Sequence, residues 1–190
     1  MPYSIKMIGV TKAQKALKDV KNKLTVGLKK LKDESVELKI SGINITFSIE
    51  KDSITPLLKR LPRIMKEAHK EAVKQLVDLL KNALNDAMED PVWEWNGDSR
   101  DIVDTGKLKN SLKVYVDSDD DIHIMYGEDY AAIVHYGGYF NPFGNKEVKQ
   151  YYPGRPWVSS VLEGGGPVPQ FDFEGEYRAL MSLQLLDKLK

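Results

Sequence analysis

The segment between Thr55 and Pro91 constrains the fold of this 190-residue chain more than any other. Apolar residues recur in it at helical spacing with polar residues between them, which is typical of a helix with one buried face. These apolar positions are Ile64, Ala68, Ala72, Val73, Leu76, Leu80, Ala83, Leu84 and Ala87. The helix is expected to begin near Thr55-Pro56 or at Pro62 and to end before Pro91. With about 27 residues it would be roughly 40 Å long and would form the spine of a domain. His69 beside this stripe is interpreted as a boundary residue rather than a ligand.

Two pairs of alternating segments predict antiparallel hairpins. Val36–Ile40 and Ile43–Ile49 flank the dipeptide Ser41-Gly42, which is typical of a tight turn. Leu112–Val116 and Ile122–Tyr126 alternate in the same way on either side of an acidic connection. The expected fold class is therefore α+β, with a small, mostly antiparallel sheet packed on one long helix, short helices and a C-terminal arm.

Three short helices are expected in the second half of the chain. Asp104 or Thr105 would cap the first, which runs from Gly106 to Ser111. Asp129 would cap the second, which Gly137-Gly138 would end. Arg155-Pro156 would start the third. The residues expected to point inward are Tyr130, Ile133 and Val134 in the second helix and Trp157, Val161 and Leu162 in the third.

Two stretches are expected to be loops. Val92–Ile102 holds Trp93 and Trp95, which would either anchor a binding partner or plug an edge of the core. The loop between Tyr139 and Tyr152 is rich in aromatic residues that are costly to leave in water, so it predicts a contact between subunits. Its aromatic residues are Tyr139, Phe140, Phe143, Tyr151 and Tyr152.

The two ends of the chain read as additions to a central core. We expect an N-terminal extension of helix and hairpin over residues 1–53, a core over residues 54–163, and a linker with an amphipathic arm over residues 164–190. Gly164 to Pro169 predicts the linker. The arm would dock through an apolar stripe, either on its own core or on a neighbouring protein. The stripe consists of Tyr177, Met181, Leu185 and Leu189.

A helix beginning at Thr11 is also expected, with a lysine-rich outer face. Its lysines are Lys12, Lys15, Lys18, Lys21 and Lys23. Such a face is either solvated or directed at nucleic acid or an acidic partner. Lysine plus arginine and aspartate plus glutamate both number 28, so the formal net charge is zero, which argues against wholesale coating of nucleic acid. The chain has no cysteine, and we see neither a secretory signal nor a membrane span.

The residue types that form catalytic, metal-binding and phosphate-binding motifs in other proteins do not form such a motif in this chain. Asp117, Asp119, Asp121 and Glu128 have the spacing of a calcium loop, but Ile122 stands where that loop needs glycine, so an acidic hairpin tip is the alternative. Ser111, His123 and His135 lack a nucleophile elbow, and Gly164-Gly165-Gly166 lacks a phosphate-binding sequence. We therefore expect no enzyme activity, no catalytic residues, no metal and no cofactor.

Three spaced signatures carry a resemblance to a known family. They are Asp104–Ser111, Tyr130–Gly138 and Gly154–Trp157. In this order they resemble the head–tail joining and tail-completion proteins of tailed bacteriophages, which include Mu-type virion morphogenesis proteins and the small neck proteins. The match covers about residues 60 to 165, and the first fifty residues and the tail past Gly164 depart from the short members.

The resemblance implies a structural virion protein of a phage or prophage, assembled in the cytoplasm of a bacterial host. It would form a homo-oligomeric ring in the neck that joins head to tail or completes the tail. Its partners would be other neck, connector or tail-tube proteins, with DNA only as cargo in the lumen and no membrane. The fold and assembly residues would be Asp104, Thr105, Gly106, Leu108, Ser111, Tyr130, His135, Gly137, Gly138, Gly154, Arg155, Pro156 and Trp157.

Elementary physics agrees with packing roles for these residues. Thr105-Gly106 and Gly137-Gly138 would fix turns, and Tyr130 and Trp157 would pin helices onto the sheet. Arg155 at a helix start needs a carboxylate or carbonyl partner. Two other functions stay open, namely a nucleic-acid-binding module that uses the lysine-rich helix and an unrecognised hydrolase around His135.

Overall fold

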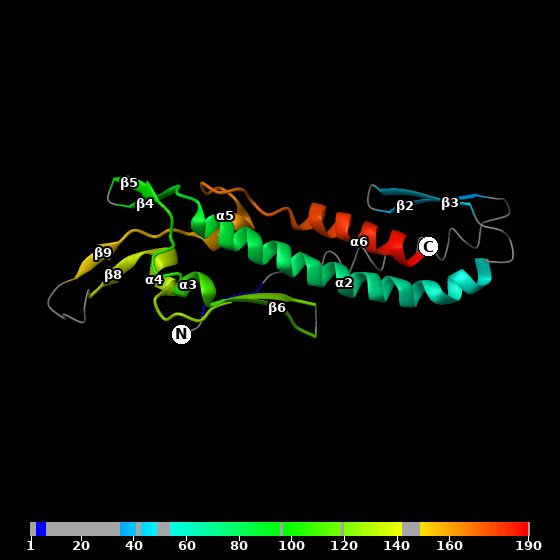
Figure 1. Ribbon diagram of the computed structural model, residues 1–190, viewed down its shortest axis with the longest axis horizontal. Helices are drawn as coiled ribbons and strands as arrows, with labels where there is room; N and C mark the ends of the chain where they lie inside the picture. The colour runs from blue at the N-terminus through cyan, green and yellow to red at the C-terminus, as the bar shows by residue number, and fades with distance from the viewer. Residues whose placement is uncertain are drawn as a thin grey trace. The chain divides into compact units, whose positions relative to one another are not determined.

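The computed structural model describes residues 3–6, 35–40, 43–48, 54–95, 97–118, 120–141 and 149–189 (Figure 1). Helices and small antiparallel sheets alternate along the chain, so the fold is α+β, as the sequence predicts. The chain divides into two compact units. Unit 1 comprises Met1–Met7 and Val77–Asp172, and unit 2 comprises Ile8–Leu76 and Phe173–Lys190. The division into segments 1–53, 54–163 and 164–190 stays a prediction.

Helix α2 (Ile54–Glu89) contributes to both units. It is 36 residues long and begins near Thr55-Pro56, so the start at Pro62 is wrong and the helix is longer than the sequence predicts. The exposed Pro62 lies inside the helix and costs it one backbone hydrogen bond. Every residue of the predicted stripe is buried except Ala83, which is half-buried. The apolar period therefore identified the buried face correctly.

The C-terminal end of α2 is closed by groups from the residues that follow it. The indole Nε1 of Trp93 donates to the carbonyl oxygen of Ala87 at 2.7 Å, and the amide of Ile102 donates to that of Met88 at 2.8 Å. These bonds satisfy carbonyls that the helix itself cannot. Trp93 is 3% exposed, so it plugs the core edge and is not a binding anchor.

The sheet of unit 1 has three antiparallel strands in the order β1 (Tyr3–Lys6), β7 (Ile122–Tyr126), β6 (Leu112–Val116). The predicted hairpin is confirmed, with Leu112 opposite Tyr126 and Val116 opposite Ile122. The inner face of β7 is fully buried, with Ile122 and Ile124 at 0% exposure. Together with the buried residues of α2 in this unit, these side chains form its core.

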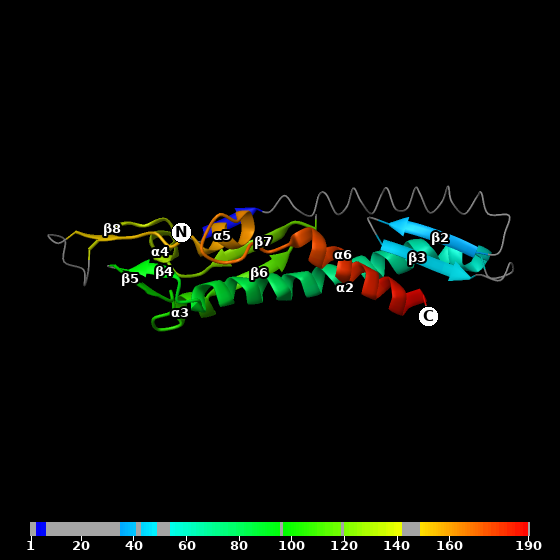
Figure 2. The same ribbon diagram turned by 90° about the horizontal axis from the view of Figure 1, so that it is seen from above.

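Two small hairpins replace the loops expected from the sequence. Strands β4 (Trp93–Trp95) and β5 (Asp98–Arg100) pair within the first loop. Strands β8 (Gly138–Phe140) and β9 (Gln150–Tyr152) pair across the aromatic loop. The expectation of irregular structure is wrong for these four segments, because three-residue strands are too short for alternation to reveal them. The β8–β9 hairpin extends away from the short helices of unit 1 in both views (Figures 1 and 2).

Three short helices complete unit 1 in the expected places. They are α3 (Lys107–Asn110), α4 (Ala131–Tyr136) and α5 (Trp157–Glu163). The stretch after α5 is irregular, as predicted, but it is attached rather than free. The amide of Phe171 donates to the carbonyl oxygen of Val161 at 2.8 Å, and Val168 is 5% exposed. The predicted linker is therefore packed against unit 1, and its role as a linker between the core and the arm stays a prediction.

Unit 2 contains the first predicted hairpin and the C-terminal helix. Strands β2 (Ser35–Ile40) and β3 (Ile43–Ser48) are antiparallel, which confirms that hairpin. Helix α6 (Phe173–Leu189) packs with its predicted stripe on the first half of α2. Met181 and Leu185 are buried against Ile64, Met65, Ala68 and Ala72, and Tyr177 and Leu189 pack at the edge of the same cluster. Nδ1 of His69 lies 2.8 Å from the hydroxyl of Tyr177, which places His69 at the predicted boundary.

The packing of α6 corrects one set of interface candidates. Tyr177, Met181, Leu185 and Leu189 are covered by α2 of the same chain, so they are not a free surface for another subunit. Their stripe needed a partner, and the chain itself supplies it. The lysine-rich helix expected from Thr11, the side chain of Phe143 and that of Asp119 lie outside the described residues. Among the described helices, none is both long and apolar enough to cross a membrane.

The two faces of α6 predict different responses to truncation. Met181→Ala and Leu185→Ala should each lower the free energy of unfolding by about 2–5 kcal/mol, because each opens a cavity. Leu183→Ala and Leu186→Ala are matched controls at 62% and 48% exposure, and they should change it by less than about 0.5 kcal/mol. Urea denaturation followed by circular dichroism measures both pairs. Equal losses from the two pairs would contradict the observed orientation of α6.

Candidate functional site

The signatures Tyr130–Gly138 and Gly154–Trp157 meet where their main chains cross at two glycines, with no side chain between them. Gly137 ends α4 with φ +76°, and a Cβ on it would lie 2.6 Å from the amide nitrogen of Gly154. A Cβ on Gly154 would lie 2.5 Å from the carbonyl carbon of Tyr136. The amide of Arg155 donates to the carbonyl oxygen of Val134 at 2.9 Å. Glycine is needed at both positions because no side chain fits between the two segments.

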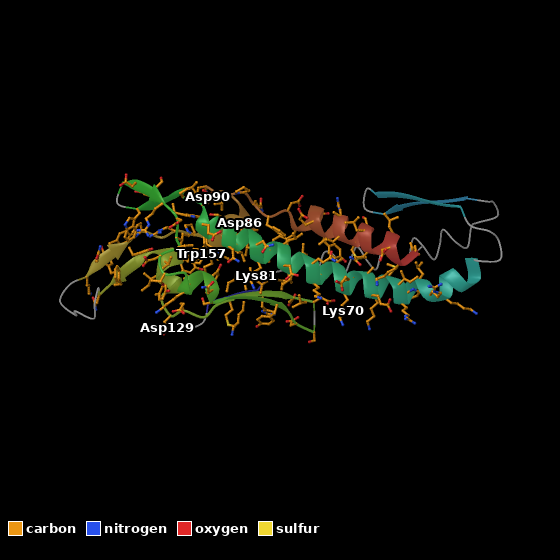
Figure 3. The ribbon with its side chains drawn as sticks, in the orientation of Figure 1. Lys70, Lys81, Asp86, Asp90, Asp129 and Trp157 are labelled. Carbon is orange, nitrogen blue, oxygen red and sulfur yellow. The ribbon has the colours of Figure 1, made fainter. Side chains whose placement is uncertain are left out.

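An aromatic cluster joins the same two signatures to the sheet. Trp157, labelled in Figure 3, is 1% exposed, and its Nε1 donates to the hydroxyl of Tyr126 at 2.8 Å. The rings of Tyr126 and His135 each meet Trp157 edge to face, with centroids 5.3 and 4.9 Å away. This arrangement confirms Trp157 as the residue that pins the helices onto the sheet.

Tyr130 does not have the inward position expected for it. It is the N-cap residue of α4, its own side chain makes no capping hydrogen bond, and it is 41% exposed. The buried positions of α4 are Ala131, Val134 and His135. The prediction of an inward Tyr130 is therefore wrong, and a cap by Asp129 stays a prediction.

The Asp104–Ser111 signature is a turn held by glycine and serine. Gly106 is the N-cap of α3 with φ +75°, which confirms its predicted constraint. The expected cap by Asp104 or Thr105 is wrong, since both are exposed and no side chain caps α3. Oγ of Ser111 donates to the carbonyl oxygen of Leu108 at 2.7 Å and accepts from the amide of Gly127 at 3.1 Å.

These bonds join α3 to the sheet. Ser111 is adjacent to the first residue of β6, and Gly127 follows the last residue of β7, so one hydroxyl closes the open end of the hairpin. Leu108 is 6% exposed and anchors α3 in the core. Lys109 forms an ion pair with Glu89 at the end of α2. The serine of this signature therefore acts as a structural pin.

Arg155 is a buried cation enclosed by aromatic rings. It is 3% exposed, and its guanidinium carbon lies 4.7 Å from the ring centroid of Trp95 and 4.9 Å from that of Tyr152. Its Nη1 donates to the carbonyl oxygen of Asp101 at 3.0 Å, and its Nη2 donates to the hydroxyl of Tyr152. Burial lowers the pKa of Arg155 from its ordinary value. The predicted carbonyl partner is thus confirmed.

The contacts of Arg155 fasten the base of the β8–β9 hairpin to its neighbour. Trp95 belongs to β4, Asp101 follows β5, and Tyr152 is the last residue of β9. A planar guanidinium can stack and donate at the same time, which a lysine cannot do. The two hairpins are therefore held together by Arg155 and by direct contact of the Trp95 and Tyr152 rings, whose centroids are 4.8 Å apart. Nothing in the sequence pattern indicated that Trp95 would be part of this cluster.

The outer face of the β8–β9 hairpin presents aromatic side chains to solvent. Tyr139 lies opposite Tyr151 with ring centroids 5.4 Å apart, and these side chains are 71% and 59% exposed. Phe140 and Tyr152 are half-buried on the other face, with centroids 6.1 Å apart. Tyr136, just before the hairpin, is 62% exposed. We call the exposed side that carries Tyr139 and Tyr151 the tyrosine face.

The residues weighed for catalysis or metal binding have structural surroundings. Nε2 of His135 lies 3.2 Å from Oγ of Ser159, but His135 is 2% exposed, which favours a packing role. Nε2 of His123 donates to Oδ2 of Asp117 at 2.7 Å, and Oδ1 of Asp117 accepts from the amide of Asp121 at 3.0 Å. Both carboxylate oxygens of Asp117 are thus used in hydrogen bonds at the tip of the β6–β7 hairpin. Among the described residues, no group of three or more histidine, aspartate or glutamate side chains could hold a metal.

Comparisons with protein-family models, with curated proteins and with solved structures give no match for this chain. The geometry of the described residues therefore carries the functional argument.

The close crossing predicts that an added methyl group lowers the free energy of unfolding more at Gly154 than at Gly127. Gly154→Ala should lower the free energy of unfolding by about 1–3 kcal/mol, because its Cβ would overlap backbone that cannot move aside. Gly127→Ala is the matched control, since its Cβ would make an ordinary 3.6 Å contact with Ser111. Thermal unfolding of both variants measures the difference. A Gly154→Ala protein as stable as the control would count against a close crossing.

The burial of His135 predicts a pH dependence of stability. Burial lowers its pKa from 6.5 to about 4, so the folded chain excludes a proton that the unfolded chain accepts. The contribution of neutral His135 to the free energy of unfolding is fully present above pH 6.5 and is lost as the pH falls through 4. The total loss is about 3 kcal/mol. Carboxylates also titrate there, so the informative quantity is the difference between wild type and His135→Gln. Parallel stability curves for the two proteins between pH 7 and pH 4 would refute this assignment.

Proposed function

We propose that this chain is a structural virion protein of a tailed phage or prophage. It forms a ring in the neck that joins head to tail or completes the tail, and it is not an enzyme. Its partners are further copies of itself and the adjoining neck, connector or tail-tube proteins, with DNA passing through the lumen as cargo. The protein assembles in the cytoplasm of the bacterial host and ends in the virion.

The placement of the resemblance signatures supports a structural role. Gly137, Gly154 and Trp157 are engaged in backbone crossing and core packing, and Ser111 closes the end of a hairpin. These are contacts that define a fold rather than bring a nucleophile to a base. His135, the centre of the alternative hydrolase, is neutral and enclosed in the core at ordinary pH because burial lowers its pKa to about 4.

The tyrosine face is the observation that carries the proposal. A protein that acts alone gains nothing from exposing a pair of tyrosines in edge-to-face contact on a hairpin whose base is fixed by a buried arginine. Tyrosine is enriched at protein interfaces because it offers a large contact area at low entropic cost. Balanced charge, with a formal net charge of zero, removes general repulsion between copies.

Assembly should depend on the tyrosine face while folding does not. Tyr139→Ser with Tyr151→Ser should abolish ring formation and leave the thermal unfolding temperature within a few degrees of wild type, because both residues are exposed. Tyr115→Ser is the matched control, an exposed tyrosine at 46% on β6. Native mass spectrometry and electron microscopy of the full chain measure ring formation.

Two results would refute the proposed role. One is a wild-type chain that stays monomeric at every concentration, with or without the other neck proteins of its phage. The other is a phage that lacks this gene and still releases joined heads and tails. Filled heads and separate tails from that mutant are the expected result.

A further inference from the structure

The tyrosine face carries a positive charge as well as aromatic rings. Lys149 is exposed and directly precedes β9, two residues before Tyr151, so its charge lies close to the tyrosine face. Tyr139 and Tyr151 together leave about 260 Å² uncovered, if a tyrosine offers about 200 Å². That is about a third of what one partner contributes to a stable protein interface. The surface is therefore large enough to form the centre of a contact.

A second exposed tyrosine of unit 1 has the opposite charge around it. Tyr130 is 41% exposed at the start of α4. Partial burial raises the pKa of its hydroxyl, and the nearby carboxylates of Glu128 and Asp104 raise it further. Asp129, labelled in Figure 3, lies next to it and is exposed. We call Asp104, Glu128 and Tyr130 the Tyr130 corner. It offers an aromatic ring and two carboxylates to a surface that offers aromatic rings and an ammonium group.

The two surfaces lie at opposite ends of one short helix. Tyr130 precedes the first residue of α4, and the hairpin with the tyrosine face begins just after the last. Six helical residues separate them by about 9 Å along the axis, and the hairpin extends away from α4 (Figures 1 and 2). The tyrosine face therefore cannot cover the Tyr130 corner of its own chain. A second copy can bring the two together.

We propose that the tyrosine face of one copy docks on the Tyr130 corner of the next copy. Lys149 then pairs with Glu128 and Asp104, and the rings of Tyr139 and Tyr151 pack against Tyr130. Each copy gives its hairpin to one neighbour and receives the hairpin of another. Such a contact joins different surfaces of the two copies, so it generates a closed ring or an open chain rather than a two-fold dimer. This inference rests on the proposed function and names the contact that would build its ring.

Disulfide trapping tests the contact directly because the chain has no cysteine of its own. Asn141→Cys places a thiol beside the tyrosine face, and Asp129→Cys places one beside the Tyr130 corner, while the proposed contact residues stay intact. The full-length protein with both substitutions should give an oxidised ladder of dimers, trimers and larger species that stops at the ring. Each single variant should stay monomeric on a non-reducing gel.

The controls separate this contact from other modes of association. Asn141→Cys with Lys113→Cys, an exposed position on β6, should give no ladder. Dimers from Asn141→Cys alone would show that two tyrosine faces meet each other, and that result would overturn the inference. Rings of wild-type protein without a ladder from the double variant would overturn it as well and leave the proposed function standing. A wild-type chain that forms no rings and does not self-associate would contradict both this inference and the proposed function.

Charge reversal gives an independent readout. Lys149→Glu should weaken self-association on the order of tenfold, as measured by sedimentation equilibrium at low salt. Adding Glu128→Lys to the same chain should restore most of the loss, because the pair is then reversed rather than removed. Loss without restoration would contradict a contact between these two residues.

Discussion

The backbone crossing of Gly137 and Gly154 is the contact on which the arrangement of unit 1 depends. Helix α4 ends at it, α5 begins shortly after it, and the β8–β9 hairpin leaves from it. The absent side chains bring the two segments so close that a Cβ on either glycine would meet backbone at 2.5 or 2.6 Å. Because backbone cannot change rotamer to make room, this one contact fixes the directions of two helices and a hairpin.

Arg155 adds rigidity beside the crossing in an unusual way. A buried cation is costly unless it is paired, and this one is stabilised by a carbonyl oxygen, a phenol and two ring faces. Each partner imposes a direction on the planar guanidinium, so the base of the hairpin is more sharply oriented than one ion pair would make it. A surface presented from such a base loses little conformational entropy when it binds.

The sequence predicted the elements whose pattern is long and regular. The helical stripe of α2 and the alternation in β2, β3, β6 and β7 reveal a buried face, because one side of each element is repeatedly apolar. The sequence did not predict strand β1 or the two hairpins with three-residue strands, because so few residues cannot establish a period. The stripe of α6 indicated that something covers Met181 and Leu185, but a pattern cannot tell which chain supplies the cover. The Arg155 cluster depends on residues more than fifty positions apart, and no local signal reports such a contact.

The crossing and the tyrosine face place different demands on the chain over evolutionary time. A change at Gly137 or Gly154 is penalised inside every monomer, whether or not a partner is present. A change at Tyr139 or Tyr151 costs the monomer almost nothing, because these side chains are exposed. Relatives that must fit different neighbours can therefore diverge freely on the hairpin while they keep both glycines. The fold thus separates the positions that make it a stable protein from the positions that decide what it recognises.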